Sequence, residues 1–283
     1  MTQHAAPTLL ADGFVFLEGP RWHEGRLWVS DMWGFKAYAV GMDGSREELF
    51  ALPERPSGLG FLPDGTPLVV SMANRKVLKW VGGKLEVHAD LGPLVKADVN
   101  DMVVDAQGRA YVGNFGYDLL GGEAARPAEL IRVDPDGSAR QVADGLNFPN
   151  GAVIIGGRTL VVAETFGNVL TAFDLAADGT LSNRRTWAAL GERTPDGICL
   201  DQANGIWVAS FMTGEFVRVT EGGTVTDIVA VPGKAAVACQ LGGEDGKTLF
   251  CLTYAGTIED LHQGKAAGAI ETVRVAVAAA GSP

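Results

Sequence analysis

The sequence predicts an all-β fold, a six-bladed β-propeller. A phrase made of a turn followed by a β run recurs six times, and neighbouring copies lie about 44 residues apart. Apolar residues within the copies alternate with a period of two, whereas helical repeats of this length would show a period of 3.6. One four-stranded propeller blade has this length, and six blades account for nearly all 283 residues. We therefore expect one domain over residues 1–283.

The six copies predict one strand in the middle of each blade. Each begins with a Gly-containing turn of the kind that closes a β-hairpin. In chain order they are HEGRLWVSD (23–31), PDGTPLVVSM (63–72), AQGRAYVGN (106–114), GGRTLVVAE (156–164), QANGIWVAS (202–210) and EDGKTLFCLT (244–253). Their strand ends align on positions 30, 71, 113, 163, 209 and 252, at intervals of 41, 42, 50, 46 and 43 residues.

A second recurring phrase precedes each copy and predicts the first strand of the blade, which in a propeller runs along the central channel. It occupies residues 17–22, 56–61, 99–104, 149–154, 195–200 and 238–242. One position repeats 12 to 14 residues before each strand end, occupied in turn by Glu18, Ser57, Asn100, Asn150, Asp196 and Cys239. Equivalent positions of six blades form a ring around the axis, so we expect these side chains to converge.

The ring predicts a central axial metal site. Glu18, Asn100, Asn150 and Asp196 offer two carboxylates and two amide oxygens, ligands that suit calcium, magnesium or manganese. Taken singly, Asn-Gly and Asp-Gly are common turn signals and need no metal. Glu18 does not fit that alternative because Glu is a poor turn residue, and the four residues share one register.

Closing the ring requires the two chain ends to supply strands to the same blade, since an unpaired edge strand invites aggregation. Residues 13–16 and 272–277 are the expected partners. The alternative is that residues 279–283 and part of what precedes them form a loose tail.

Composition narrows the function classes. The net charge is −11, and the sequence has no basic stripe that could bind nucleic acid. It also contains no run of 18 apolar residues, so we expect no membrane span. The N-terminus has no basic segment followed by an apolar core, so we expect a cytoplasmic protein. Cys199, Cys239 and Cys251 have no metal-binding or disulfide spacing, and we expect them to be buried as small apolar residues.

Several short motifs together carry a family resemblance across the whole chain. They are EGPRW at 18–22, Asn100-Asp101 with DAQGR at 105–109, FPNG at 148–151, AET at 163–165 and TPDG at 194–197. With them the sequence resembles the senescence-marker-protein, gluconolactonase and luciferin-regenerating-enzyme family, which includes regucalcin-like lactonases and, more distantly, diisopropyl fluorophosphatase.

The resemblance implies a metal-dependent lactonase. The positions of Glu18, Asn150 and Asp196 would bind one divalent ion, Asn100 would contact metal, water or substrate, and Asp196 would also serve as the general base. Calcium is the expected ion, and zinc, manganese, magnesium and iron are used by other members of the family.

The sequence departs from the sugar-lactonase pattern at the expected substrate site. Asp98 stands where gluconolactonases carry an arginine, Asn114 and Phe115 replace a Gly-Thr-Met-like stretch, and Phe166 begins a segment where an arginine is common. Aromatic and Met side chains are expected near the same face, at positions 33, 35, 115, 148, 166, 211 and 212. They predict either a less polar pocket or ordinary blade packing.

These observations give one mechanism and two rivals. A metal would polarise the carbonyl of a lactone, Asp196 would take a proton from water, and Asn100 and Asn114 would orient the substrate. The rivals are a metal-dependent phosphotriesterase or esterase, and a metal-stabilised propeller that binds without catalysis. None of the four histidines suggests a nucleophilic triad. A monomer or weak homo-oligomer is expected.

Overall fold

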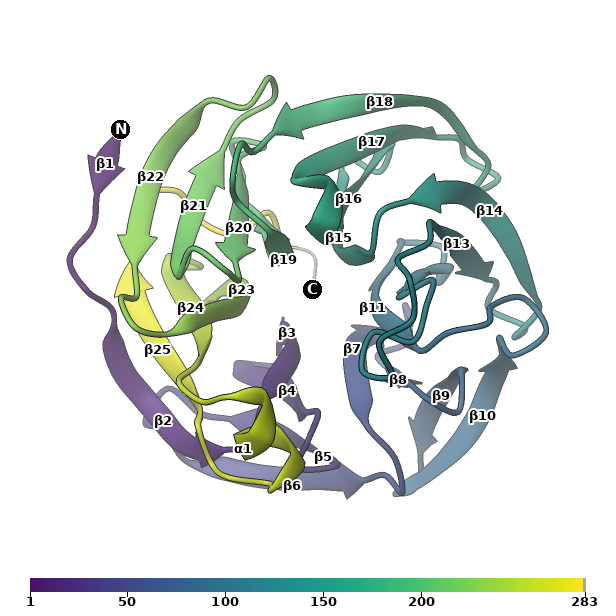
Figure 1. The fold of residues 1–283 in the computed structure, drawn as a ribbon, viewed down its shortest axis with the longest axis horizontal. Helices are drawn as coiled ribbons and strands as arrows, with labels where there is room; N and C mark the ends of the chain where they lie inside the picture. The colour runs from purple at the N-terminus through teal and green to yellow at the C-terminus, as the bar shows by residue number, and fades with distance from the viewer. Residues whose placement is uncertain (282–283) are drawn as a thin grey trace.

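The computed structural model describes residues 1–281, which form six sheets around a central axis, each built on four antiparallel strands (Figure 1). The predicted six-bladed β-propeller is confirmed. Blades 1 to 3 each have four strands in chain order from the axis outward. They are β3 (Leu17–His23), β4 (Arg26–Asp31), β5 (Lys36–Val40), β6 (Arg46–Ala51); β7 (Pro56–Phe61), β8 (Pro67–Ser71), β9 (Lys76–Val81), β10 (Lys84–Asp90); β11 (Val99–Val104), β12 (Ala110–Asn114), β13 (Ala128–Val133), β14 (Ala139–Leu146).

Blades 4 and 5 follow the same order, and blade 6 takes its outermost strand from the N-terminus. The strands are β15 (Pro149–Ile155), β16 (Thr159–Glu164), β17 (Val169–Leu175), β18 (Leu181–Ala189); β19 (Pro195–Leu200), β20 (Ile206–Ser210), β21 (Glu215–Val219), β22 (Val225–Ala230); β23 (Ala235–Gly242), β24 (Thr248–Tyr254), β25 (Gly268–Arg274) and β2 (Thr8–Phe14). Two short helical segments, η1 (Thr165–Gly167) and α1 (Ile258–His262), complete the elements. The predicted first strand of blade 6 begins three residues earlier than expected.

The ring is closed by a strand from each chain end, as predicted, but the N-terminal strand covers Thr8–Phe14 and not the expected residues 13–16. Strand β2 pairs antiparallel with β25, from Thr8 opposite Thr272 to Phe14 opposite Gly268. The strand expected to run to residue 277 ends at Arg274. An additional strand, β1 (Thr2–Gln3), pairs in parallel with β22 of blade 5 and was not expected. The alternative of a loose tail is wrong for Ala279 and Ala280, whose backbone nitrogens donate to the carbonyl oxygens of Gly246 and Leu200, and residues 282–283 lie outside the described part.

The core lies between neighbouring blades, which explains the continuous apolar runs of the second strands. Along β16, Val161 and Ala163 pack towards blade 5, whereas Leu160 and Val162 pack towards blade 3. Successive side chains of a strand point to opposite faces, and here both faces are covered. The three cysteines are free and buried, and all belong to the cluster between blades 5 and 6, as expected.

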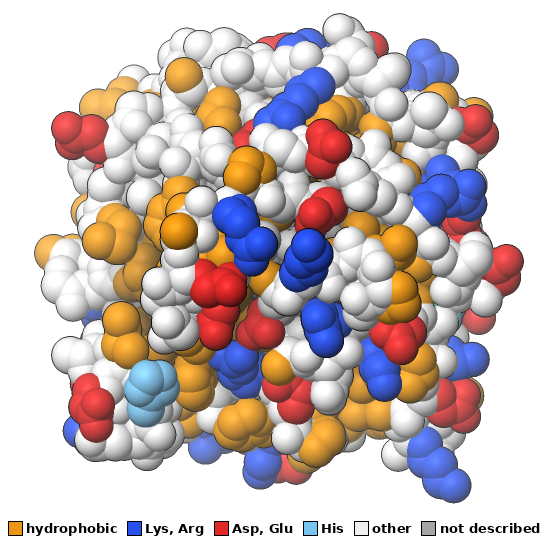
Figure 2. All heavy atoms as spheres, turned by 45° about the vertical axis from the view of Figure 1, so that its right-hand side comes forward, with side chains coloured by type: hydrophobic (Ala, Val, Ile, Leu, Met, Phe, Trp, Pro, Cys, Tyr) orange, Lys and Arg blue, Asp and Glu red, His pale blue; other side chains and the backbone are white. Residues whose placement is uncertain are grey.

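The surface carries charges of both signs. On the face that Figure 2 presents, Lys and Arg side chains are interspersed with Asp and Glu and separated by apolar side chains. Within the described residues no helix is long and apolar enough to cross a membrane.

Candidate active site

Close contacts between the inner strands bring the predicted ring residues together. Strands β3, β7, β11, β15, β19 and β23 lie nearest the axis (Figure 1). A Cβ on Gly151 would lie 2.6 Å from the backbone nitrogen of Ile198, and one on Gly197 would lie 2.3 Å from the Cβ of Ala238. The glycines of the Asn-Gly and Asp-Gly pairs therefore lie within strands, where they permit close packing, and do not form hairpin turns.

The same contacts correct the sequence alignment in blade 6. Gly151 packs on Gly197, and Gly197 packs in the same way on Ala238. The ring position precedes each of these residues, so blade 6 contributes Val237 and not Cys239. The Cys239 sulfur lies 3.8 Å from that of Cys199 and 3.5 Å from the carbonyl oxygen of Trp207, within the apolar core between blades 5 and 6.

Glu18, Asn100, Asn150 and Asp196, here called the axial quartet, line one cavity. All four side chains are buried. The cavity has a volume of about 210 Å³ and is open to solvent, and we call it the axial cavity. The structure thus brings together four residues that are separated by up to 178 positions (18 to 196) in the chain.

The two carboxyl groups of the axial quartet interact unfavourably in the absence of a cation. Burial raises the pKa of Glu18 well above its usual value, and the nearby charges of Asp196 and Asp101 raise it further. The pKa of Asp196 is likewise raised, first by burial and then by Asp101, while the Asn150 amide opposes this shift. Two buried carboxylates sharing one cavity favour binding of a positive charge or a proton.

The two amides of the axial quartet differ in the atoms they leave available. The Asn100 nitrogen donates to the Pro149 carbonyl oxygen at 3.4 Å, and its oxygen accepts from the Ser57 hydroxyl at 3.3 Å. The Asn150 nitrogen donates to the Thr165 hydroxyl at 3.3 Å. In the described part of the chain, Asn150 Oδ1 and Asp196 Oδ1 are buried without a hydrogen-bond partner.

The donor set fits a hard divalent cation. Three or more His, Cys, Asp or Glu side chains do not converge into a metal site among the described residues, so a site must also use amide oxygens. The axial quartet provides two carboxylates and two amides, and two of its buried oxygen atoms have no protein partner within residues 1–281. Buried polar atoms are normally paired, and hard cations take carboxylate and amide oxygens as ligands.

The predicted substrate residues divide into two groups. Phe115 and Phe166 line the axial cavity together with Asn100. Asn114 does not line it, because its nitrogen donates to Glu129 and its oxygen accepts from the backbone nitrogen of Gly116. Asp98 also lies outside the lining and accepts from the Arg55 guanidinium at 2.6 Å.

Aromatic rings form one wall of the axial cavity. Phe115 stacks on Phe148 with a centroid distance of 4.4 Å, and Phe166 meets Phe148 edge-on at 5.0 Å. Phe148 adopts a left-handed backbone conformation with φ of 61°, which is rare for a bulky residue and is found where the surrounding structure holds it. Phe211 and Met212 also line the cavity, whereas Trp33 and Phe35 do not.

Sequence analysis missed several residues that line the axial cavity, namely Phe16, Met32, Leu119, Thr165 and Thr194. The sequence could have indicated Thr165, because this residue directly follows the repeated strand of blade 4. The end of that strand lies beside the start of the inner strand, where the polar ring residues are. Met32 occupies the equivalent position of blade 1, and Phe16 and Thr194 each lie two residues before a ring residue, so the repeat carried a signal for them too. Leu119 lies in the loop between β12 and β13, where the repeat has no equivalent position.

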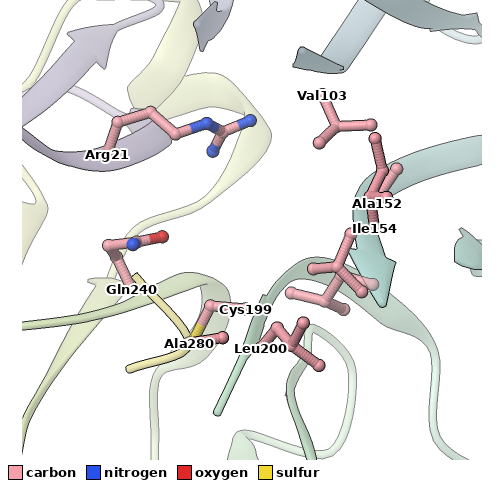
Figure 3. A pocket seen from close by; sticks show the side chains of 10 residues that line it. Arg21, Val103, Ala152, Ile154, Cys199, Leu200, Gln240 and Ala280 are labelled. Atoms are coloured by element: carbon pink, nitrogen blue, oxygen red, sulfur yellow. The ribbon is translucent and has the colours of Figure 1, made fainter. Parts of the chain in front are cut away.

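A second cavity lies at the opposite end of the inner strands (Figure 3). Arg21 and Gln240 enter it from one side and face Val103, Ala152 and Ile154, with Ala280 of the C-terminal segment beside them. The Arg21 guanidinium donates to Asp101 at 3.0 Å and to the carbonyl oxygen of Met102. Both members of this ion pair are buried; Arg21 lines the second cavity, and Asp101 directly follows Asn100 of the axial quartet.

Comparison with known proteins places this geometry in context. The family model described as the SMP-30/Gluconolactonase/LRE-like region matches residues 16–255. Pentonolactonase XacC of Haloferax volcanii is 28% identical over 280 residues, covering 94% of this chain and 92% of the relative. The 6-deoxy-6-sulfogluconolactonase of Pseudomonas putida is 27% identical over 215 residues, covering 70% and 72%.

The fold also matches a solved structure over its full length. The crystal structure of a calcium-binding protein, regucalcin, from Agrobacterium tumefaciens superposes with a TM-score of 0.83. The sequences are 20% identical, and the match covers 100% of this chain and 97% of the other. At this identity the likeness shows the propeller fold.

Proposed function

The chain belongs to the SMP-30/Gluconolactonase/LRE-like family, and from this premise we propose that it is a divalent-metal-dependent hydrolase that opens a lactone. One observation carries the proposal: the axial quartet lines a single cavity in which Asn150 Oδ1 and Asp196 Oδ1 are buried without partners among residues 1–281. Two relatives that are named as lactonases support the reaction class.

Glu18, Asn150 and Asp196 are proposed to hold the cation, with calcium the first choice because their ligand atoms are hard oxygens. The similar regucalcin structure is described as calcium-binding. Asn100 already uses both ends of its amide within the protein, which favours contact with water or substrate over a primary role as ligand. A bound cation would supply Lewis-acid polarisation of an ester carbonyl.

Asp196 is proposed as the general base. Its carboxylate takes a proton from the water that attacks the acyl carbon, and then returns the proton to the alkoxide oxygen when the ring C–O bond breaks. Its carboxylate lies in the axial cavity, and its Oδ1 atom is buried without a hydrogen-bond partner among residues 1–281. The Arg21–Asp101 ion pair holds Asp101 in place beside the quartet.

The lining of the axial cavity favours a substrate less polar than a sugar lactone. Beyond the quartet, Phe115, Phe148 and Phe166 form one wall, and Phe16, Met32, Leu119, Phe211 and Met212 add further apolar surface. A polyhydroxylated ring would lose hydrogen bonds to water against these side chains without replacing them. The same lining is compatible with a phosphotriester or a simple apolar ester, so both classes belong in the substrate screen.

The test combines metal analysis with hydrolysis of aliphatic, aromatic and sugar lactones, apolar esters and phosphotriesters, followed by pH indicator. Asp196→Asn is expected to lower kcat by about 10²- to 10⁴-fold. Glu18→Gln is expected to lose turnover mainly through weaker cation binding, measured by calorimetry. Glu24→Gln, an exposed acid outside the cavity, is the matched control and should retain both.

Two results would contradict the proposal. Full activity of the chelated protein would exclude metal dependence. Cation binding with no turnover of any substrate in the screen would favour a metal-stabilised binding propeller.

A further inference from the structure

Thr165 occupies a position between two inner strands at the axial cavity. It is the first residue of η1, directly after β16 of blade 4, and its side chain is buried and lines the cavity. Its hydroxyl donates to the Pro195 carbonyl oxygen at 2.8 Å and accepts from the Asn150 nitrogen at 3.3 Å. Thr165 therefore connects the residue preceding Asp196 with Asn150.

The directions of these two hydrogen bonds are determined by chemistry. A carbonyl oxygen can only accept, so the single hydroxyl proton of Thr165 must point to Pro195. The hydroxyl then has only lone pairs left for Asn150, and the amide atom facing it must be the nitrogen. The opposite amide atom, Asn150 Oδ1, is left buried without a hydrogen-bond partner among the described residues.

Asn100 shows the contrast within the same ring. Ser57 donates its hydroxyl proton to the Asn100 oxygen at 3.3 Å, so that oxygen already has a protein partner. Ser57 and Thr165 both contact a ring asparagine through a hydroxyl group, but with opposite hydrogen-bond direction. In both cases a backbone carbonyl sets the direction: the Pro149 carbonyl accepts from the Asn100 nitrogen and leaves the Asn100 oxygen to Ser57, whereas the Pro195 carbonyl takes the Thr165 proton and leaves Thr165 to accept from Asn150.

We propose that Thr165 is a positioning residue that fixes the amide of Asn150 with Oδ1 presented to the cation. The inference rests on the proposed function, because it needs a cation at the axial quartet. Without the hydroxyl, the amide can rotate by 180° and present its NH₂ group, which cannot bind a cation. Partners of this kind typically change metal affinity by about 10- to 100-fold.

The test measures calcium and manganese affinity by calorimetry in the full-length protein. Thr165→Val keeps the shape of the side chain without its hydroxyl, and Thr165→Ala is a second deletion in case the first does not fold. Both are expected to weaken binding about 10- to 100-fold. Thr165→Ser keeps the hydroxyl and should stay within about threefold of the unmodified protein.

A double-mutant cycle separates positioning from a structural role. Asn150→Asp offers an oxygen in either orientation of its planar group, so adding Thr165→Val to it should change affinity by less than about threefold. Melting of the chelated variants reports their stability independently of the cation. An equal loss of affinity with Asn or Asp at position 150 would overturn the inference and indicate a structural role.

The outcomes also distinguish the two proposals. If the unmodified protein binds calcium or manganese and Thr165→Val binds it equally well, the positioning role is wrong and the metal site stands. If the unmodified protein binds neither of these ions nor magnesium, zinc or iron(II), both proposals are wrong.

Discussion

At the scale of single residues, the axial cavity holds acidic side chains that are buried and repel one another. Glu18 and Asp196 are buried together, and Asp101 adds a third negative charge that is balanced by Arg21. Removing one partner of a buried ion pair leaves the other charge unpaired, at a cost of about 3–5 kcal/mol. Loss of Arg21 would therefore leave Asp101 as an unpaired buried charge next to Asn100.

His23 gives a residue-scale prediction about pH. Its ring stacks on Phe61 at 3.7 Å, and burial lowers its pKa from the ordinary value of 6.5. Below pH 6.5 the unfolded chain therefore binds a proton at His23 more readily than the folded protein does. The free energy of unfolding that the neutral, stacked His23 contributes is present above pH 6.5 and is lost as the pH falls below it. Urea unfolding between about pH 7.5 and pH 5.5 should show the loss.

The control is His23→Phe, which keeps an aromatic ring for stacking but cannot titrate. Its free energy of unfolding should fall less over the same pH range. His88, whose pKa burial also lowers, is present in both proteins and cancels in the comparison. Identical pH profiles for the two proteins would show that His23 does not contribute.

At the scale of secondary structure, the inner strands combine a bulge with close interblade packing. In β19, the pairing with β20 shifts between Pro195 and Ile198, and Asp196 lies at this irregularity. The same shift occurs in β3, β7, β11 and β15 at the positions of their ring residues. Bulges redirect side chains, so the irregularity of the inner strand is what lets the ring residues converge on the axis.

Gly197→Ala tests this packing. The added methyl group would lie 2.3 Å from the Ala238 Cβ and 2.7 Å from its Cα, so β19 and β23 must separate. We expect a loss of about 1–3 kcal/mol in urea unfolding, and weaker cation binding because Asp196 is adjacent. Gly92→Ala is the control, since its nearest contact is the Asp90 carboxylate at 3.1 Å, and it should change stability by less than about 0.5 kcal/mol. Equal effects of the two substitutions would contradict the packing argument.

At the scale of the whole molecule, the apolar clusters are shared between blades, so a blade does not complete a core by itself. Residues of blades 2 and 3 form one cluster, and residues of blades 4 and 5 form another. We propose on this basis that residues 1–283 unfold as one domain. Fluorescence of the six Trp residues and far-UV circular dichroism should then report one coincident transition, and two separate transitions would contradict a single domain.

The closure of the ring gives a prediction at the same scale. Deleting residues 1–14 removes β2, exposes the edge of β25 and takes away Phe14, which is fully buried. We expect a loss of roughly 3 kcal/mol or more, or aggregation through the free edge. Deleting residues 1–7 removes only β1 and should cost much less, because β1 forms two residue pairs with β22. Comparable melting of the two truncated proteins would show that β2 does not hold the ring closed.

Much of the architecture could be predicted from the sequence because a propeller repeats its local pattern. The turn and the alternating strand recur in every blade, so the six blades and their inner strands followed from spacing, and the pairing of the chain ends followed from the need to close the ring. The repeated position also identified Glu18, Asn100, Asn150 and Asp196 as neighbours in space. Blade 6 was misaligned by two residues, since Val237 carries no polar signal and Cys239 resembled a ring residue.

The details of the site depended on contacts between blades, which no local pattern encodes. Asn114 follows the repeat yet turns to Glu129, Asp98 pairs with Arg55 of blade 2, and Thr165 contacts Asn150 and Pro195. The sequence alone determined the ring position in five of the six blades, because the repeated strand pattern is local. Only the tertiary structure decided which of their atoms remain free, because that depends on hydrogen bonds between residues brought together by the closed ring.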